Sequence, residues 1–477
     1  MQGKKHFSEK LFTNFQLSSR VPEDNFYRRL KGALDLQWLY KATKKYYGTE
    51  GQNSIDPVVF FKLIMIGYLE NLASDRRIIA TVSMRLDMLY FIGYDIDEPL
   101  PWHSTLSRTR QLYGQEVFKE LFKEVLKQCI EKGMVAGRRQ AVDSVQVIAN
   151  ASMESLTQKE LLEDGDLYAD NLEEEEKKSS DNKPGTNNTH YSTTDPDARI
   201  AQKPGKPTDL KYLAQVSVDT AHHVITTIQA HHADKRDSQC LSEVIDDVIE
   251  NLKPQGVIVE EVVADTNYSS GEAIRYLEDN NLTGYIPNHG GFKVNREGFT
   301  YNKENNCYVC SQGIQLKYTR TYIENTGYTK IEYRSTAKDC KDCPLRKECI
   351  GKAPLKRITH NIDKPLYERM HQRMQTRYAK RMIKIRQSTV EPVLGTLVNF
   401  LAMRRVNTRG IDLADKCMLM SATVYNLKKM MKFTQSKVKV VAKVMHKLEE
   451  NIQKRVVLML YTIRALLNKN YGVPFLI

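Results

Sequence analysis

Two short apolar segments that carry aspartates constrain the fold of this chain more than any other feature. Residues 140–149 alternate between apolar and polar side chains as a strand does, and they contain Asp143. Residues 256–264 are typical of a buried strand, which ends directly before Asp265. Ligands of open α/β sheets gather at the carboxyl ends of strands. We therefore expect the two aspartates to lie close together.

The sequence around these aspartates predicts a mixed α/β unit. The expected elements are two antiparallel strands (residues 210–219 and 222–230), a helix (238–252), the strand before Asp265, a second helix (269–280) and a short strand (282–286). A long interruption at 154–207, with acidic residues at Glu173–Glu176 followed by Ser, Asn, Pro and Gly, predicts a flexible insertion.

A third carboxylate, Glu391, is followed by Pro392 and then by apolar residues at helical spacing. Because proline is favoured in the first turn of a helix, the pattern predicts that a helix begins at Glu391. Taken alone, Glu391 is best explained as a capping carboxylate that the helix dipole favours. Taken with the two aspartates, it completes a set of oxygen ligands suited to Mg²⁺ or Mn²⁺.

Charge is distributed unevenly along the 477 residues, a length that implies about two to four domains. The formal net charge is +13, and from Lys352 onward there are 26 Lys and Arg against 7 Asp and Glu. A basic C-terminal section indicates a polyanionic partner, of which nucleic acid is the commonest. The apolar runs are too short to span a bilayer, so we expect no membrane association and a cytoplasmic location with reduced thiols.

The first part of the chain, up to about residue 135, is predicted to be helical. Residues 76–94 carry apolar side chains at helical spacing, residues 95–102 break the pattern, and a further helix is expected through Arg108 and Arg110 to residue 130. Two helices around a proline-containing turn are compatible with a helix-turn-helix DNA reader, and equally with a plain helical bundle.

These motifs, in this order, resemble the acid-triad (DDE) transposases of bacterial insertion sequences. The resemblance rests on Asp143, Asp265 and the RQSTVEPVLG segment at 386–395, and it covers nearly the whole chain. The segments 194–199 (TDPDAR) and 203–205 resemble the family's stretch before the strand hairpin, and 426–429 (NLKK) resembles its closing helix. Many relatives carry a basic residue about two turns beyond the glutamate, where this chain has Val398.

The resemblance implies an α/β RNase H-like (retroviral integrase-like) catalytic core with an N-terminal all-α domain, a small zinc-binding insert and a basic helical C-terminal segment. Asp143, Asp265 and Glu391 would bind two Mg²⁺ (or Mn²⁺) ions for in-line phosphoryl transfer on double-stranded DNA, both the element's terminal repeats and the target. A homodimer or larger assembly associated with the bacterial nucleoid is implied by resemblance alone. The expected domains are 1–136, 137–290, 291–360, 361–435 and 436–477.

Candidate DNA contacts follow from basic residues near these motifs. They are Arg108, Arg110, Arg386, Arg404, Arg405, Lys428 and Lys429. For any single one of them, a solvated surface position is the more economical explanation.

Five cysteines lie between the second and third carboxylates, at Cys307, Cys310, Cys340, Cys343 and Cys349. In a reducing compartment, two Cys-x2-Cys pairs with a further cysteine predict a structural zinc site, although free loop cysteines are the alternative. The family's insert resembles residues 308–313, which favours Cys310, Cys340, Cys343 and Cys349 as ligands. Cys307 is either spare or a replacement for Cys349.

Three rival interpretations remain open from sequence. An RNase H-like nuclease without strand transfer would use the same carboxylates. A non-catalytic, transposase-derived DNA-binding protein would have no physical need to keep all three acids. A zinc-dependent hydrolase is disfavoured, because four thiolates leave no open coordination position on the metal.

Overall fold

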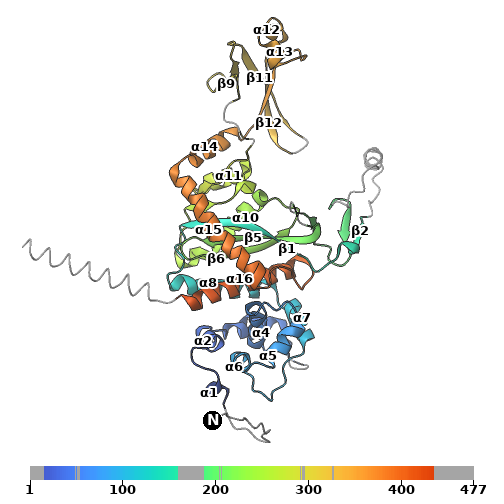
Figure 1. Cartoon of the computed structure of the whole chain (residues 1–477), viewed down its shortest axis with the longest axis vertical. Helices are drawn as coiled ribbons and strands as arrows, with labels where there is room; N and C mark the ends of the chain where they lie inside the picture. Colours follow the sequence, from blue (N-terminus) through green and yellow to red (C-terminus); the bar gives the residue numbers. More distant parts are fainter. Residues whose placement is uncertain are drawn as a thin grey trace, which may run out of the picture. The chain divides into compact units, whose positions relative to one another are not determined.

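A computed structural model describes residues 16–48, 50, 54–159, 187–202, 205, 207–290, 292, 296–324 and 327–433 (Figure 1). By internal contacts the chain divides into two units, Met1–Leu427 and Lys428–Ile477. The acidic residues Glu173–Glu176, the segment 203–204 and the expected C-terminal tail at 436–477 all lie outside the described residues.

The N-terminal part of the first unit is helical, as expected. Its helices are α1 (Leu17–Arg20), α2 (Phe26–Ala33), α3 (Trp38–Thr43), the short η1 (Lys44–Tyr46), α4 (Pro57–Leu69), α5 (Asp75–Val82), α6 (Leu86–Ile92), α7 (His103–Leu112) and α8 (Gln115–Glu131). Helix α4 is buried on nearly all sides and forms the centre of this part. Its start is fixed locally, because the Asp56 carboxylate accepts hydrogen bonds from the backbone N–H groups of Val58 and Val59.

Two expected helices are each divided in the structure. Residues 76–94 form α5 and α6, because the backbone of Arg85 is extended and its guanidinium pairs with Asp87 in the first turn of α6. The expected helix through Arg108 to residue 130 is α7 followed by α8, with an extended Tyr113 and Gly114 between them. Helical spacing continued through both breaks, so the sequence pattern alone did not reveal them.

A six-stranded mixed sheet forms the centre of the first unit. Its strands are β1 (Arg139–Ile148), β4 (Arg199–Ala201), β5 (Asp209–Asp219), β6 (Val224–His232), β7 (Glu261–Val263) and β8 (Thr283–Tyr285). The strand order is β4-β5-β1-β7-β8, and β6 also pairs with β5. Strand β1 is antiparallel to β5 and parallel to β7, and β7 is parallel to β8. The expected alternation of strands and helices around the two aspartates is therefore present.

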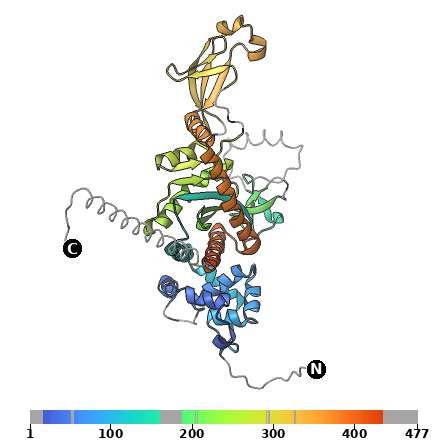
Figure 2. The same cartoon turned by 60° about the vertical axis from the view of Figure 1, so that its left-hand side comes forward.

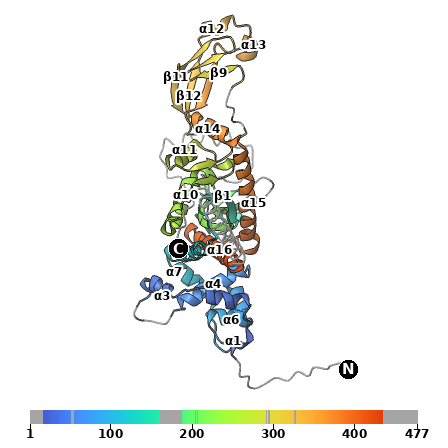
Figure 3. The ribbon, with the colours of Figure 1, turned by 90° about the vertical axis from the view of Figure 1, so that its left-hand side faces the viewer.

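Helices cover both faces of this sheet (Figure 3). On one side lie α10 (Asp237–Leu252) and α11 (Gly271–Asp279), and on the other lies α15 (Arg377–Phe400), which crosses the sheet diagonally (Figure 1). The remaining helical elements near the core are η3 (Lys253–Gln255), η4 (Thr266–Tyr268), α14 (Lys364–Met374) and α16 (Ile411–Lys432). The side chain of Asn426 on α16 pairs with both the N–H and the C=O of Ile225 on β6.

The segment between the second aspartate and Glu391 contains a separate five-stranded antiparallel sheet (Figure 2). Its elements are β9 (Phe299–Asn302), β10 (Cys307–Cys310), β11 (Gln315–Ile323), β12 (Thr329–Arg334), α12 (Ala337–Lys341), α13 (Arg346–Cys349) and β13 (Arg357–Asn361). Its small core consists of Tyr308, Leu316, Tyr333 and Ile358. The described edges of the long insertion add η2 (Met153–Ser155) and the strand pair β2 (Leu156–Gln158) and β3 (His190–Ser192).

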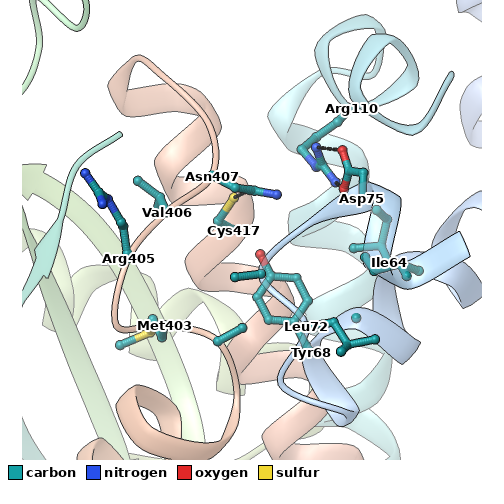
Figure 4. Close-up of a pocket in the computed structure, with 14 residues that line it drawn as sticks. Ile64, Tyr68, Leu72, Asp75, Arg110, Met403, Arg405, Val406, Asn407 and Cys417 are labelled. Carbon is teal, nitrogen blue, oxygen red and sulfur yellow. Dashed lines mark hydrogen bonds and ion pairs between the residues drawn. The ribbon is translucent and has the colours of Figure 1, made fainter. Parts of the chain in front are cut away.

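The helical part and the core meet around a small cavity lined by α4, α5, α7, α16 and the loop before α16 (Figure 4). In it, Arg110 and Asp75 form a buried ion pair at 2.8 Å. The ammonium of Lys416 donates to the backbone carbonyls of Arg110 and Tyr113, at 3.1 and 2.6 Å. These contacts tie α7 to α16. Among the described residues, no helix is long and apolar enough to cross a membrane.

Candidate active site

Asp143 lies on β1, and Asp265 lies two residues beyond the end of its parallel neighbour β7. Strand β1 pairs with β7 so that Arg139 faces Glu261 and Ala141 faces Val263. Continuing this register by two residues places Asp143 beside Asp265, and the two-residue period of a strand directs both side chains to one face. The expected proximity of the two aspartates is therefore explained by the register of the sheet.

A single guanidinium joins the two carboxylates. Nη2 of Arg386 on α15 lies 2.8 Å from Oδ2 of Asp143 and 3.8 Å from Oδ2 of Asp265. Nε of the same arginine donates to the backbone carbonyl of Val142 at 3.4 Å. Arg386 is only 7% exposed. The two aspartates thus share one buried positive charge, which Arg386 supplies from α15.

Each aspartate is also held by the backbone beside it. Oδ1 of Asp143 accepts from the N–H of Ser144 at 2.8 Å, and Oδ1 of Asp265 accepts from the N–H of Asn267 at 2.9 Å. Asp265 is the N-cap of the short helix η4, which accounts for that second bond.

Burial raises the pKa of both aspartates above the usual value, and Arg386 acts in the opposite direction. Asp237 contributes further to the rise in each pKa, because it adds a second negative charge nearby. The two carboxylates are therefore poised to gain from a bound cation.

Both aspartates line a polar cavity of about 520 Å³ at this end of the sheet. Asp237, the first residue of α10, lies in the same wall and accepts a hydrogen bond from Gln215 at 2.7 Å. Further polar and charged residues complete the lining, among them Lys235, Arg236, Asn267, Ser269, His289 and Tyr328. The sequence analysis did not identify Asp237, although its place at the start of an amphipathic helix after the strand hairpin was a usable signal.

Glu391 is not among the residues that line this cavity. It is exposed in the middle of α15, which begins at Arg377 and not at Glu391 as the sequence predicted. The start is fixed by Thr376, whose side chain accepts from the N–H of Ala379. The helix runs through Pro392 because buried residues on both sides of the proline, such as Val390 and Val393, pack against the core.

The basic residues predicted to contact DNA fall into three groups. Arg110 and Arg386 are buried in ion pairs, at 6% and 7% exposure, so neither guanidinium is open to a phosphate in this arrangement. Arg108, Arg404 and Arg405 are exposed, which is compatible with such a role. Lys428 and Lys429 are partly buried and belong to the second unit of the chain.

The five cysteines of the insert do not form a cluster. Among the described residues, no group of three or more His, Cys, Asp or Glu side chains is arranged to hold a metal ion. Cys307 is buried, and Cys310 packs against the aromatic core of the insert sheet. Cys340, Cys343 and Cys349 lie partly exposed in and between α12 and α13. Burial in an apolar core accounts for the first two without a metal.

A second cavity, of about 750 Å³, lies next to the first and shares Ser269, His289 and Tyr328 with it. The hydroxyl of Tyr328 accepts from Arg236 at 2.8 Å, which joins the end of the β11–β12 hairpin to the wall beside the aspartates. The rest of its lining is mainly basic and aromatic, including Phe292, Arg296, Tyr308, Lys330, His360, Lys364 and Tyr367.

Comparison with solved structures gives only weak likeness. A piggyBac transposase synaptic complex with hairpin DNA is 9% identical, with a TM-score of 0.28, over 84% of this chain and 76% of that chain. Two Mos1 transposase complexes, one with the left transposon end and one with Mn, are 12% and 11% identical, with TM-scores of 0.17 and 0.16. Each of these covers 56% of this chain and 73% of that chain. Scores this low carry no argument about the fold.

Comparison with protein families is more specific. No curated protein matches this chain. A family model described as a transposase domain matches residues 15–112, and one described as a transposase DDE domain matches residues 309–431, which include Glu391. The two matches confirm the resemblance seen in the sequence, and the chain is a DNA transposase of the DDE class.

Proposed function

We propose that this transposase cuts the ends of an insertion sequence and joins them to target DNA at the cavity that holds Asp143 and Asp265. The main observation behind this proposal is that the two aspartates share one arginine side chain. A carboxylate oxygen of each lies within 4 Å of the same guanidinium nitrogen of Arg386. The strand order around them supports an RNase H-like core. Oxygen ligands in this arrangement suit Mg²⁺ or Mn²⁺.

Asp143 and Asp265 would hold the metal ions, and Glu391 is the candidate for a further ligand. When bound, such ions activate an attacking hydroxyl and stabilise the leaving oxygen in phosphoryl transfer. The chain's own contribution is to fix the two aspartates. The sheet register sets their spacing, and backbone N–H groups orient one oxygen of each.

Glu391 extends from the same helix as Arg386, so α15 is the element that would bring it to the cavity. Its carboxylate is exposed and lies about 140° around the helix from Arg386, from the rotation of 100° per residue. The assignment of Glu391 rests on its place in the matched DDE segment and on the resemblance of residues 386–395 to the family's third motif.

We further propose that DNA phosphates contact the basic wall of the two joined cavities. Lys235, Arg236 and His289 face the space beside the aspartates, and Lys330 and Lys364 line the adjoining cavity. Phosphate contacts by such side chains release counterions, so DNA affinity should fall steeply with salt. The exposed Arg108, Arg404 and Arg405 remain candidates for contacts further from the reaction centre.

Metal-dependent cleavage of DNA that carries the element's ends tests the catalytic assignment. Asp143→Asn, Asp265→Asn and Glu391→Gln should each abolish cutting yet retain DNA binding, because each change removes one anionic ligand and keeps the side-chain size. Glu272→Gln, an exposed carboxylate on α11, is the matched control and should cut normally. Cutting by Asp143→Asn at the wild-type rate would refute the proposed site.

Strand transfer separates the transposase from its nearest rival. With pre-cut ends and a target plasmid, a transposase joins the 3′ ends to the target, whereas a nuclease only hydrolyses DNA. Absence of both cutting and joining, with salt-sensitive binding retained, would favour the non-catalytic DNA-binding interpretation. The same experiment, run across protein concentrations, tests the homodimer or larger assembly that the resemblance implies.

A structural zinc ion in the insert is proposed from the sequence spacing of its cysteines alone, because no three of them are brought together among the described residues. Cys340, Cys343 and Cys349 are close in sequence and partly exposed, which suits thiolate ligands. Cys310 is the weaker member of the set, because it already packs against the aromatic core. Elemental analysis of the purified chain should give one zinc per chain, lost in Cys343→Ser and kept in Cys240→Ser; a wild-type chain without zinc would contradict the site.

A further inference from the structure

The buried guanidinium of Arg386 lies where a metal ion for the two aspartates would bind. Its Nη2 atom contacts Oδ2 of both Asp143 and Asp265, at 2.8 and 3.8 Å. Its side chain is 8% exposed, against 17% and 31% for the two aspartate side chains. The positive charge is therefore more deeply buried than either negative charge that it neutralises.

Two negative carboxylates held side by side at the same level of a sheet repel each other unless a cation lies between them. In this structure the nearest such cation is supplied by α15. A divalent ion held by the pair would use the same Oδ2 atoms and would stand within a few ångströms of the guanidinium. Like charges at that distance in a buried site repel strongly, so the ion and the guanidinium disfavour each other there.

We propose that Arg386 is the resident counter-cation of the aspartate pair, and that divalent metal binds in competition with it. The inference rests on the proposed function, because it takes Asp143 and Asp265 as the metal ligands. Arg386 is a positioning residue in this scheme. It holds the two carboxylates together before metal arrives, and its side chain leaves them when metal is bound.

The competition also involves the helix that carries Glu391. Arg386 is anchored at two places, by the aspartates through Nη2 and by the Val142 carbonyl through Nε. Loss of the first anchor leaves only the second to hold this part of α15 to β1 through Arg386. Metal binding would therefore loosen the attachment of α15, the helix that carries Glu391, to β1.

Metal affinity in the absence of DNA tests the proposal without any measurement of activity. Isothermal titration of the full chain with Mn²⁺ would compare wild type, Arg386→Gln and Arg386→Lys. Arg386→Gln should bind Mn²⁺ about tenfold more tightly or better, since a unit charge close to the ion is removed. Arg386→Lys keeps the charge and should remain within about threefold of wild type, because the charge at the pair is the same.

Arg381→Gln is the matched control, since Arg381 is an exposed arginine on the same helix. It removes the same charge from the chain and should change Mn²⁺ affinity less than about twofold, because solvent screens exposed charges. An equal gain for Arg381→Gln and Arg386→Gln would mean a general charge effect, and would overturn the proposal. Unchanged or weaker binding in a folded Arg386→Gln would overturn it as well.

Two further measurements test the proposal even if the Arg386→Gln variant does not fold without metal. Arg386→Gln leaves two buried carboxylates without their cation, so it can unfold at low metal concentration. In that case its melting temperature should rise more steeply with Mn²⁺ than that of wild type, and an equal rise would refute competition. Asp143→Asn should lose Mn²⁺ binding; if it binds as wild type does, the proposed metal site fails and the competition proposal fails with it, whereas unchanged binding in Arg386→Gln alone overturns only the competition.

Discussion

Arg110 provides the sharpest test of the assignment of basic residues, because it was expected to contact DNA and is instead buried. Its guanidinium makes two hydrogen bonds to Asp75, at 2.8 and 3.1 Å, and the side chains are 7% and 14% exposed. Replacing Arg110 by Met leaves the largely buried Asp75 carboxylate, 14% exposed, without its ion-pair partner. Breaking a buried ion pair from one side costs about 3–5 kcal/mol.

The Arg110–Asp75 pair lies beside the loop before α16 (Figure 4). The backbone carbonyl of Arg110 also accepts from Lys416 on α16, so the pair lies at the junction between the helical part and the core. Arg110→Met should therefore shift the first transition in a urea titration of the full chain, followed by circular dichroism. A double variant, Arg110→Met with Asp75→Leu, should recover most of the loss, because replacing a whole buried pair by apolar residues is often neutral.

Arg108 is the matched control, two residues earlier on the same helix and exposed. Arg108→Met should change the free energy of unfolding by less than about 0.5 kcal/mol, as surface substitutions usually do. If Arg108 contacts phosphate, its loss should instead lower the slope of log affinity against log salt by about one. Equal stability of the Arg110→Met and Arg108→Met variants would refute the reasoning.

Three further predictions concern polar groups that are buried or partly buried. Burial lowers the pKa of His360 to about 4, below its ordinary value near 6.5, so the unfolded chain binds the extra proton. The contribution of neutral His360 to the stability of the insert should be fully present above about pH 6.5 and be lost as the pH falls towards 4. Followed by tyrosine fluorescence, the unfolding of the insert in acid should be less pronounced in His360→Gln than in wild type. Asp237→Asn should weaken Mn²⁺ binding severalfold, because a negative charge leaves the cavity wall; unchanged titration curves would show that it does not act on the site. Asn426→Ala should cost about 1–3 kcal/mol in chemical denaturation, because both backbone groups of Ile225 lose their partner; a loss below the error of the measurement would contradict this.

The proximity of the two aspartates could be predicted from the sequence of the two strand segments alone. Alternation identified β1, and a continuous apolar run identified the strand before Asp265. The expectation that both aspartates follow strand ends holds for Asp265, whereas Asp143 lies in the middle of β1. What the sequence lacked was the register, which the pairing of Arg139 with Glu261 supplies. Register depends on packing across the sheet and cannot be obtained from either strand alone.

The roles of the arginines could not be predicted, for a different physical reason. Arg108 and Arg110 are close neighbours on one helix, and only their angular positions decide which is buried. The partners that neutralise the buried arginines are remote in sequence: Asp75 pairs with Arg110, and Asp143 pairs with Arg386. A basic residue near a motif suggests DNA contact, but its burial depends on tertiary packing that local sequence does not encode.

The start of α15 was the most consequential error, and its physical cause bears on the mechanism. Proline at position 392 indicates a helix start because it has no N–H to donate, yet here it lies inside a helix that Thr376 caps. The missing donor leaves the carbonyl of Ser388 without its usual helical partner, so the helix is locally weakened between Arg386 and Val393. Glu391 lies in this weakened stretch, and Arg386 at its edge is held by the aspartate pair. Because Glu391 is exposed and does not line the cavity, its carboxylate would reach the aspartates only if this stretch of α15 bent or turned.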